Sequence, residues 1–319
     1  MISIGWNQNN EIIISSINAD TVQNKLNYYI EEDYGLTESF VLRSFNIEGN
    51  SSIYDVINTS KTIDTIFFSH NDKIKNKTLK QVFNLYKSTS VSENLKDIGT
   101  TLVSRYYFIN EEPVYQLGRI NDELGANISF NPNFESNFSG IVGMSNLENN
   151  WNVNGELNLQ IENYFQNAER GSFYWKRIDS LSQIIKLGTL IPHPFGWRTG
   201  IEVKYQHEIF RGLYTLMENR YILNTYVPLL NKVGLGYVIG KSTPTTEGMV
   251  FGYRKSKYQA FSFSSYRNRM NDRYLPTSGT EIQLTIDGGL DGEISYVNSS
   301  FLLTKIRPLN ANIFYKIKY

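Results

Sequence analysis

One segment near the middle of the chain alternates strictly between apolar and polar residues, and this alternation constrains the fold more than any other feature of the sequence. Small or apolar residues fill every second position, and amides or carboxylates fill the others: Val153, Gly155, Leu157, Leu159 and Ile161 against Asn152, Asn154, Glu156, Asn158, Gln160 and Glu162. A period of two is that of a β-strand, in which successive side chains point to opposite faces. The segment is therefore predicted to be a strand with one apolar and one polar face.

The same alternation recurs through the rest of the chain. From about residue 122 onward the helical period is absent, and alternating segments include residues 201–206, 281–287 and 312–319. The predicted strands reach about ten residues or more, longer than the roughly 5 to 6 residues of a typical soluble strand. At roughly 16 residues for each strand and its turn, the about 195 residues of this part hold about 12 strands. We therefore expect one large, mainly β, antiparallel domain.

Two environments fit strands with one apolar face. In a soluble sandwich the apolar face covers a dry core, whereas in an outer-membrane β-barrel it meets lipid and the polar face lines the lumen. The long runs of Glu, Lys, Gln and Asn on the polar face favour the barrel. Aromatic residues near predicted strand ends fit the girdles of a barrel at the two membrane interfaces, and they also fit a soluble β-core: Tyr164, Phe165, Tyr174, Trp175, Phe195, Trp197, Tyr221 and Tyr226.

Composition and charge narrow the class of protein further. Aromatic residues make up 14% of the 319 residues. Cysteine is absent, and its absence rules out disulfides and thiolate metal sites. The 31 basic and 31 acidic residues cancel, so the positive charge expected of a nucleic-acid-binding protein is missing. No run approaches 18 apolar residues, which argues against a transmembrane helix. Residues 1–7 lack the features of a secretory signal, so an exported form would begin upstream of them.

The first 120 residues follow a different, mixed pattern. Apolar residues four apart predict a helix over residues 21–32, with Asp20 as its N-cap, and a strand follows at 40–47. The pattern from about 60 to 131 predicts the order strand, helix, helix, strand, strand. The five segments are residues 63–69, 77–86, 92–103, 106–109 and 114–117. This order describes a compact α+β unit of about 70 residues.

Residues with catalytic or metal-binding chemistry are few. The three histidines, His70, His193 and His207, have no ligand-type or triad partner at a suitable spacing, and His193 lies between two prolines where a turn is expected. Carboxylates on the predicted polar faces are expected to line a lumen: Glu156, Glu162, Glu202 and Glu281. We therefore predict no catalytic residue, no cofactor-binding residue and no metal site, and hence no enzyme.

Two short motifs have simpler explanations than the functions they suggest. The glycine-rich stretch 234–240 matches a dinucleotide fingerprint only in part, because its last glycine is one residue late and no helix pattern follows. Small residues on a barrel face explain it better. The sequence Leu-Pro-Thr-Ser-Gly at 275–279 looks like a sorting signal, but an alternating strand follows it instead of an apolar anchor. It is predicted to be a turn that leads into a strand.

These elements together resemble the Omp85 superfamily of BamA- and TamA-like outer-membrane assembly proteins. The α+β unit at about 61–132 resembles a POTRA domain, with Ile-Asp-Thr-Ile at 63–66 and Tyr-Phe-Ile-Asn-Glu-Glu-Pro at 107–113. Residues 148–159, 181–183 and 190–195 look like the first strands of the barrels in this family. The most specific match is Asp-Arg-Tyr-Leu-Pro-Thr-Ser-Gly at 272–279, which is similar to the family's turn into a mid-barrel strand.

Two features depart from the family's pattern. Its barrels are 16-stranded, and a late loop inside the lumen carries an Arg-Gly-Phe-type motif. Here the expected count is about 12, and Arg-Gly-Leu-Tyr at 211–214 lies too early, between the predicted fifth and sixth strands. The sequence is therefore interpreted as lacking both its signal peptide and its last strands, although the alternating end at 313–319 also suits a complete barrel.

The resemblance implies three domains and a function. Residues 1–58 form a partial POTRA-like unit, 59–132 a POTRA domain and 133–319 an outer-membrane β-barrel that lacks its C-terminal strands. The protein is expected in the bacterial outer membrane with its N-terminal part in the periplasm. Its expected partners are unfolded outer-membrane proteins or secreted polypeptides, membrane lipids and accessory lipoproteins. The hypothesis is assembly or translocation of these polypeptides without a cofactor; the alternatives are a passive porin and a periplasmic binding module.

Overall fold

The computed structural model describes residues 4–7, 11–32, 38–69, 72–87, 89, 95–120, 123–147, 150–179, 181–227, 230–271, 275–308 and 314–318. Two compact units make up the chain. The first comprises Met1–His70, Phe83–Gly99 and Pro113–Phe130, and the second comprises Asn71–Val82, Thr100–Glu112 and Asn131–Tyr319.

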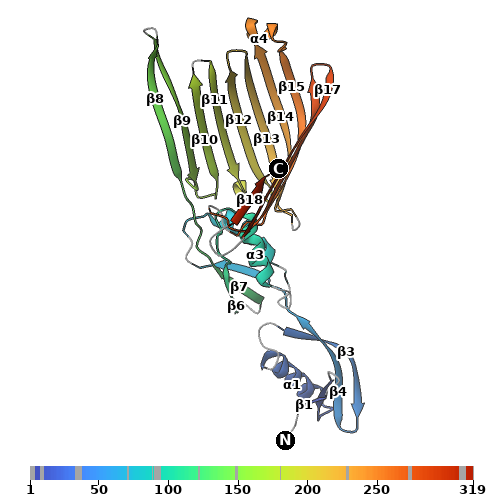
Figure 1. The fold of residues 1–319 in the computed structure, drawn as a ribbon. Helices are drawn as coiled ribbons and strands as arrows, with labels where there is room; N and C mark the ends of the chain where they lie inside the picture. Colours follow the sequence, from blue (N-terminus) through green and yellow to red (C-terminus); the bar gives the residue numbers. More distant parts are fainter. Residues whose placement is uncertain are drawn as a thin grey trace. The chain divides into compact units, whose positions relative to one another are not determined.

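The first residues form a four-stranded antiparallel sheet with one helix (Figure 1). Its strands stand in the order β1 (Ile4–Asn7), β2 (Glu11–Ile14), β4 (Ser51–Ser60) and β3 (Glu38–Glu48), and helix α1 spans Ala19–Glu32. The helix and the strand predicted here are confirmed, but the predicted N-cap is wrong. The side chain of Asn18 accepts the backbone N–H of Thr21 at 3.1 Å, and Asp20 already lies in the first turn of the helix.

The next elements follow the order strand, helix, helix, strand, strand, and they match four of the five predicted segments but not the strand predicted at 106–109. They are β5 (Thr65–Phe68), α2 (Asn76–Val82), α3 (Leu95–Arg105), β6 (Val114–Ile120) and β7 (Glu123–Ser129), with a short 3₁₀ helix at Asn84–Tyr86. The three strands form a sheet in the order β5, β7, β6, in which β5 and β7 are parallel and β6 and β7 are antiparallel. No helix in the described part of the chain has the length and apolar character needed to cross a membrane.

One strand prediction in this region is wrong. Residues 106–109 form an irregular segment, and the last two strands of the unit are instead β6 and β7. Tyr106, Phe108 and Ile109 are all at least 97% buried, so they do not alternate between two faces. A short apolar run of this kind cannot be distinguished by its pattern from a buried strand.

Eleven antiparallel strands form the largest sheet, in strict chain order from β8 to β18 (Figure 1). The bounds are β8 (Asn137–Leu147), β9 (Asn150–Glu162), β10 (Arg170–Asp179), β11 (Ser182–Ile191), β12 (Gly200–Phe210), β13 (Tyr214–Thr225), β14 (Lys232–Pro244), β15 (Ser256–Asn268), β16 (Gly279–Asp291), β17 (Ile294–Pro308) and β18 (Phe314–Lys318). The mainly β, antiparallel prediction is confirmed, with eleven described strands where about 12 were expected. Among the described residues β8 and β18 do not pair, so a closed barrel stays a prediction.

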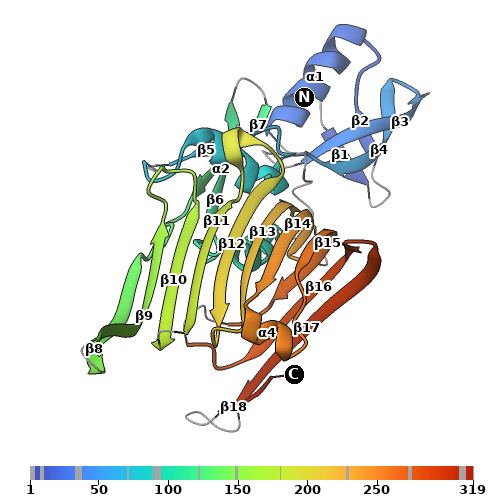
Figure 2. The same cartoon turned by 90° about the horizontal axis from the view of Figure 1, so that it is seen from above.

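The sheet is curved (Figure 2). Its two faces carry different side chains. Side chains from β11 to β17 line a single pocket, so the face that carries them is concave; we call it the inner face. The cross-strand register places Glu202, Ile222, Ser262 and Asp287 in one row across that face. The neighbouring row on the outer face is apolar and includes Leu223, Leu235, Phe263 and Ile286. The alternation in the sequence therefore separates a polar inner face from an apolar outer face.

Connections differ in length at the two ends of the sheet. At one end the turns after β9, β11, β13 and β15 are long, and a 3₁₀ helix at Pro194–Gly196 lies in the second of them. At the other end most turns are short, except that helix α4 (Thr246–Val250) interrupts the connection between β14 and β15. Thr245 caps this helix by accepting the backbone N–H of Gly248 at 3.0 Å.

Candidate functional site

Strand β8 is an open edge of the large sheet. It pairs with β9 on one side, and among the described residues no strand pairs with it on the other side. Its apolar side chains are exposed on both faces, with Ile141 at 74% and Met144 at 67%. Unpaired backbone N–H and C=O groups on such an edge can bind another extended chain.

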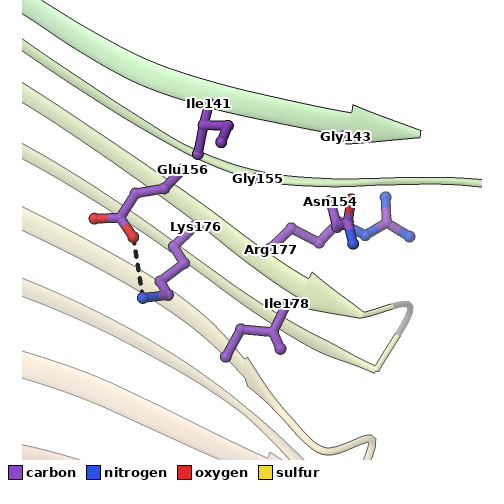
Figure 3. A pocket seen from close by; sticks show the side chains of 8 residues that line it. All are labelled: Ile141, Gly143, Asn154, Gly155, Glu156, Lys176, Arg177 and Ile178. Carbon is purple, nitrogen blue, oxygen red and sulfur yellow. Dashed lines mark ion pairs between the residues drawn. The ribbon is translucent and has the colours of Figure 1, made fainter. Parts of the chain in front are cut away.

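A shallow pocket of about 340 Å³ lies beside this edge, on strands β8 to β10. Figure 3 shows Glu156 of β9 and Lys176 of β10 pointing toward each other across it, and their ion pair measures 3.0 Å. Ile141 of β8 and Ile178 of β10 flank this pair. Both charged side chains are about two-fifths exposed, so solvent screens their attraction and the pair adds little to stability.

The position of Gly155, where β9 pairs with β8, has no room for a side chain. A Cβ atom on Gly155 of β9 would lie 2.2 Å from the carbonyl oxygen of Ile141 and 2.9 Å from the Cα atom of Val142, both on β8. Gly155 also has a φ of 155°, which side chains rarely permit. The pairing of the edge strand therefore depends on the absence of a side chain at this position.

The middle of the inner face carries a network of ion pairs. Two parallel contacts of 2.9 Å join the guanidinium of Arg220 on β13 to the carboxylate of Asp287 on β16. Arg220 also donates to Ser262 at 3.1 Å and to Glu218 at 3.2 Å, and the hydroxyl of Tyr258 donates to Glu218 at 2.6 Å. This network joins β13, β15 and β16, and it reaches across β14, which lies between β13 and β15 in the sheet.

A second cluster on the same face surrounds Glu202. Its carboxylate contacts Lys204 at 2.6 Å and Lys232 at 3.1 Å, and it accepts the side-chain amide of Asn224 at 3.0 Å. Both clusters line a pocket of about 470 Å³, to which Arg105 and Tyr107 also contribute. The inner face is thus polar, charged and internally paired, as in a lumen.

A buried cluster ties the segment after α3 to one end of the large sheet. The hydroxyl of Tyr106 lies 2.7 Å from Nε2 of His193, and Nδ1 of His193 lies 2.8 Å from the carbonyl oxygen of Trp197. Because a carbonyl only accepts, Nδ1 carries the proton and Nε2 accepts the Tyr106 hydroxyl. Tyr226 packs against both rings, at centroid distances of 4.8 Å to Tyr106 and 5.8 Å to His193.

Neighbouring contacts strengthen this buried cluster of Tyr106, His193 and Tyr226, which we call the clamp. The hydroxyl of Tyr107 donates to the carbonyls of Ala168 and Glu169 at 3.1 and 3.0 Å, in the turn after β9. The guanidinium of Arg170 lies 4.0 Å from the centre of the Tyr107 ring, within cation–π range. Residues 106–108 therefore contact the turns after β9, β11 and β13, and they hold this end of the large sheet in place.

Protonation of His193 is expected to weaken this clamp. Burial lowers the pKa of His193 below its usual value of 6.5, opposed in part by the carbonyl of Trp197. The unfolded chain therefore takes up this proton first, and stability is complete above about pH 6.5 and falls as the pH drops below it. Replacing His193 with Gln should remove this component, which amounts to at most about 1.4 kcal/mol per pH unit.

Urea unfolding in detergent micelles between pH 5 and 8 measures this component. His207→Gln is the control, since His207 stands in the middle of β12, in register with Met217 of β13 and away from the clamp. An equal pH dependence in wild type and His193→Gln would contradict the prediction.

The structure places the other predicted residues as follows. His70 and residues 272–274 lie outside the described residues. Among the described residues no group of three metal-ligating side chains is present. Glu162 is buried and accepts Arg170 at 3.1 Å and the backbone N–H of Glu135 at 2.9 Å, and Glu281 accepts the hydroxyl of Tyr266 at 3.2 Å. These carboxylates have structural partners.

The structure explains the glycine-rich stretch at 234–240 and the Leu-Pro-Thr-Ser-Gly sequence at 275–279. A Cβ on Gly240 would meet the ring of Tyr258 at 1.9 Å, so the glycines of β14 make room for side chains on the inner face. Thr277 and Ser278 donate their backbone N–H groups to Asn271 at 3.0 Å each, and β16 begins at Gly279. The predicted turn into a strand is confirmed, and Arg211 lies as predicted in the turn between the fifth and sixth strands of the large sheet.

The predicted aromatic girdle receives mixed support. Four of the named residues are exposed in the turns after β9 and β11: Tyr164, Phe165, Phe195 and Trp197. The prediction is wrong for Tyr226, which packs in the clamp, and wrong for Tyr174, which shares the inner face with Lys176. Sequence reasoning missed the clamp as a whole, because Tyr106 and His193 are 87 residues apart in the chain.

Comparison with known proteins shows a shared fold. No family model matches the sequence, and no curated protein is similar to it. The structure of CdiB from Escherichia coli aligns with a TM-score of 0.51 and 14% identity, and CdiB from Acinetobacter baumannii with 0.51 and 12%. Each alignment covers 95% of this chain and 61% of CdiB.

A third solved structure is that of BamA from Haemophilus ducreyi lacking POTRA domains 1–3. It aligns with a TM-score of 0.45 and 15% identity over 94% of this chain and 64% of that one. The chain thus spans less than two thirds of each of these structures. BamA and CdiB belong to the Omp85 superfamily, and the resemblance to that superfamily is confirmed at the level of the fold by the two CdiB structures.

Proposed function

From the Omp85-type fold, we propose that this chain is an outer-membrane protein that inserts or translocates other polypeptides and has no enzymatic activity. The observation that supports this most directly is the open edge of β8. A nascent strand cannot leave its backbone unpaired in lipid, because each unsatisfied group costs several kcal/mol. An edge strand that accepts it by β-augmentation removes that cost.

The apolar outer face and the polar inner face support a place in the membrane. The outer rows of the sheet expose large apolar side chains such as Leu235, Phe261 and Val297, whereas the inner face carries the Arg220 and Glu202 clusters. Lipid contact suits the first face and an aqueous lumen suits the second. We assign residues 133–319 to the barrel on this basis.

The N-terminal part is proposed to be periplasmic. Residues 59–132 have the strand, helix, helix, strand, strand order of a POTRA domain, and residues 1–58 are proposed as a partial unit of the same kind. In the three-stranded sheet β7 lies between β5 and β6, so each outer strand has one side without a strand partner among the described residues. These edges are proposed as further binding sites for an extended client polypeptide. The proposed clients are unfolded outer-membrane proteins or secreted polypeptides.

Disulfide crosslinking tests the role of β8. The chain contains no cysteine, so Ile141→Cys introduces a single thiol on the edge strand. We expect this variant to crosslink to an unfolded outer-membrane barrel protein that carries one cysteine in its final strand. Leu216→Cys is the matched control, because it lies on the same inner face of β13, which is paired on both sides.

Two outcomes of this experiment separate the alternatives. Equal crosslinking at positions 141 and 216 would contradict the proposal that the edge strand β8 accepts client polypeptides. A passive porin would give no crosslink at either position and would leave the amounts of other outer-membrane proteins unchanged when the chain is depleted. For an insertion factor, depletion should lower those amounts.

A further inference from the structure

Two lysines stand directly opposite each other on the outer face of the large sheet. Lys241 of β14 pairs in register with Lys257 of β15, and both side chains are exposed. Among the described residues neither ammonium group lies within 4.0 Å of a carboxylate oxygen. Like charges opposite each other destabilise a strand pair. An anion bound between them would remove this repulsion.

The pair marks the end of an apolar belt. On β14 the outer face carries Leu235, Tyr237 and Ile239 before Lys241, and on β15 it carries Phe263 and Phe261 before Lys257. Phe261 is 78% exposed and Leu235 is 66% exposed. From Leu235 to Lys241 the strand rises about 20 Å, at roughly 3.3 Å per residue. In a membrane, this end of the belt is the level of the lipid headgroups.

The adjoining connection has the composition of a membrane-surface segment. Helix α4 and the residue after it expose Met249, Val250 and Phe251, at 57, 83 and 68%. Arg254 and Lys255 follow and are exposed as well. Apolar side chains beside basic ones are typical of segments that bind the surface of an anionic membrane.

Acidic groups nearby do not balance this charge. Glu247 lies in α4, and Glu293 lies in the turn between β16 and β17. The carboxylate of Asp291 points to the inner face, where it accepts the hydroxyl of Ser256 at 2.8 Å. Four cations therefore face two exposed carboxylates at this end of β14 and β15.

We propose that Lys241 and Lys257, supported by Arg254 and Lys255, bind the phosphate of an anionic membrane lipid. The apolar residues of the α4 connection insert beside the bound headgroup. The ammonium groups donate to the phosphate oxygens, and their long methylene chains lie along the apolar belt. This inference rests on the proposed place in the membrane, but it does not depend on client binding.

Native mass spectrometry of the full chain in detergent tests the site. We expect wild type to retain dioleoylphosphatidylglycerol several-fold more than dioleoylphosphatidylcholine. The double variant Lys241→Gln with Lys257→Gln should lose this preference. Lys186→Gln with Arg267→Gln is the control, since it removes two cations elsewhere on the sheet, and it should keep the preference.

Equal retention of the two lipids by wild type would overturn the proposal, and so would an unchanged preference in the double lysine variant. Folding of each variant is checked by the shift in gel mobility on heating, so a loss of structure is not mistaken for a loss of binding. Failure of the β8 crosslink with the lipid preference intact would refute client binding alone. Failure of the preference with the crosslink intact would refute the lipid site alone.

Discussion

Replacing Gly155 with alanine is expected to separate the edge strand β8 from β9 and to abolish crosslinking of clients at position 141. The added Cβ would lie 2.2 Å from a carbonyl oxygen of β8, and backbone atoms cannot rotate away as a flexible side chain can. Overpacking of this kind costs about 1 to 3 kcal/mol even where side chains can adjust. In the part of the chain that the structure describes, β8 pairs with β9 alone, so few other contacts offset that cost.

Gly171→Ala is the matched control for this prediction. Gly171 lies in β10, and a Cβ there would meet only the carbonyl oxygen of Ile161, at 3.9 Å, which is ordinary contact. We expect Gly155→Ala to make β8 sensitive to limited proteolysis while the rest of the sheet stays resistant, and Gly171→Ala to behave as wild type. If β8 were equally protected in both variants, the lack of room for a side chain at Gly155 would not matter for the edge.

Local patterns in the sequence were sufficient to predict most of the fold. The alternation through Val153 and Leu157 predicts β9 because a period of two depends only on neighbouring residues and on which face is apolar. The same holds for β5, for the helices α2 and α3, and for β6. It fails at residues 106–109, where buried aromatic side chains on an irregular segment have the composition of a strand without its geometry.

Contacts between residues that are far apart in the chain could not be predicted from the sequence pattern. Arg220 and Asp287 are 67 residues apart, and their contact requires the register of three successive strand pairs. A shift of one residue in any of these pairs would move one partner to the other face. Glu202 was predicted to line a lumen, but its partner Lys232 on β14 could not be named for the same reason. The clamp at His193 likewise depends on how three turns come together.

The Arg220–Asp287 pair is expected to be the most stabilising interaction on the inner face. Its side chains are 16% and 7% exposed, and the two parallel contacts satisfy both carboxylate oxygens. Asp287→Ala leaves a guanidinium without its main partner, and removing one member of a buried pair costs about 3 to 5 kcal/mol. Because the inner face borders a solvent-accessible pocket, we expect a loss near the lower value, about 3 kcal/mol.

A second variant separates the cost of an unpaired charge from the net value of the pair. Arg220→Met with Asp287→Leu removes both charges, and replacing a buried pair by apolar residues is often neutral. We therefore expect the double variant to recover most of the free energy of unfolding lost in Asp287→Ala, measured by urea unfolding in detergent micelles. Lys176→Met removes half of the exposed pair with Glu156 and should leave stability unchanged. If Asp287→Ala were as stable as Lys176→Met, water would screen the inner face fully, and the network would contribute charge to the lumen without holding the strands together.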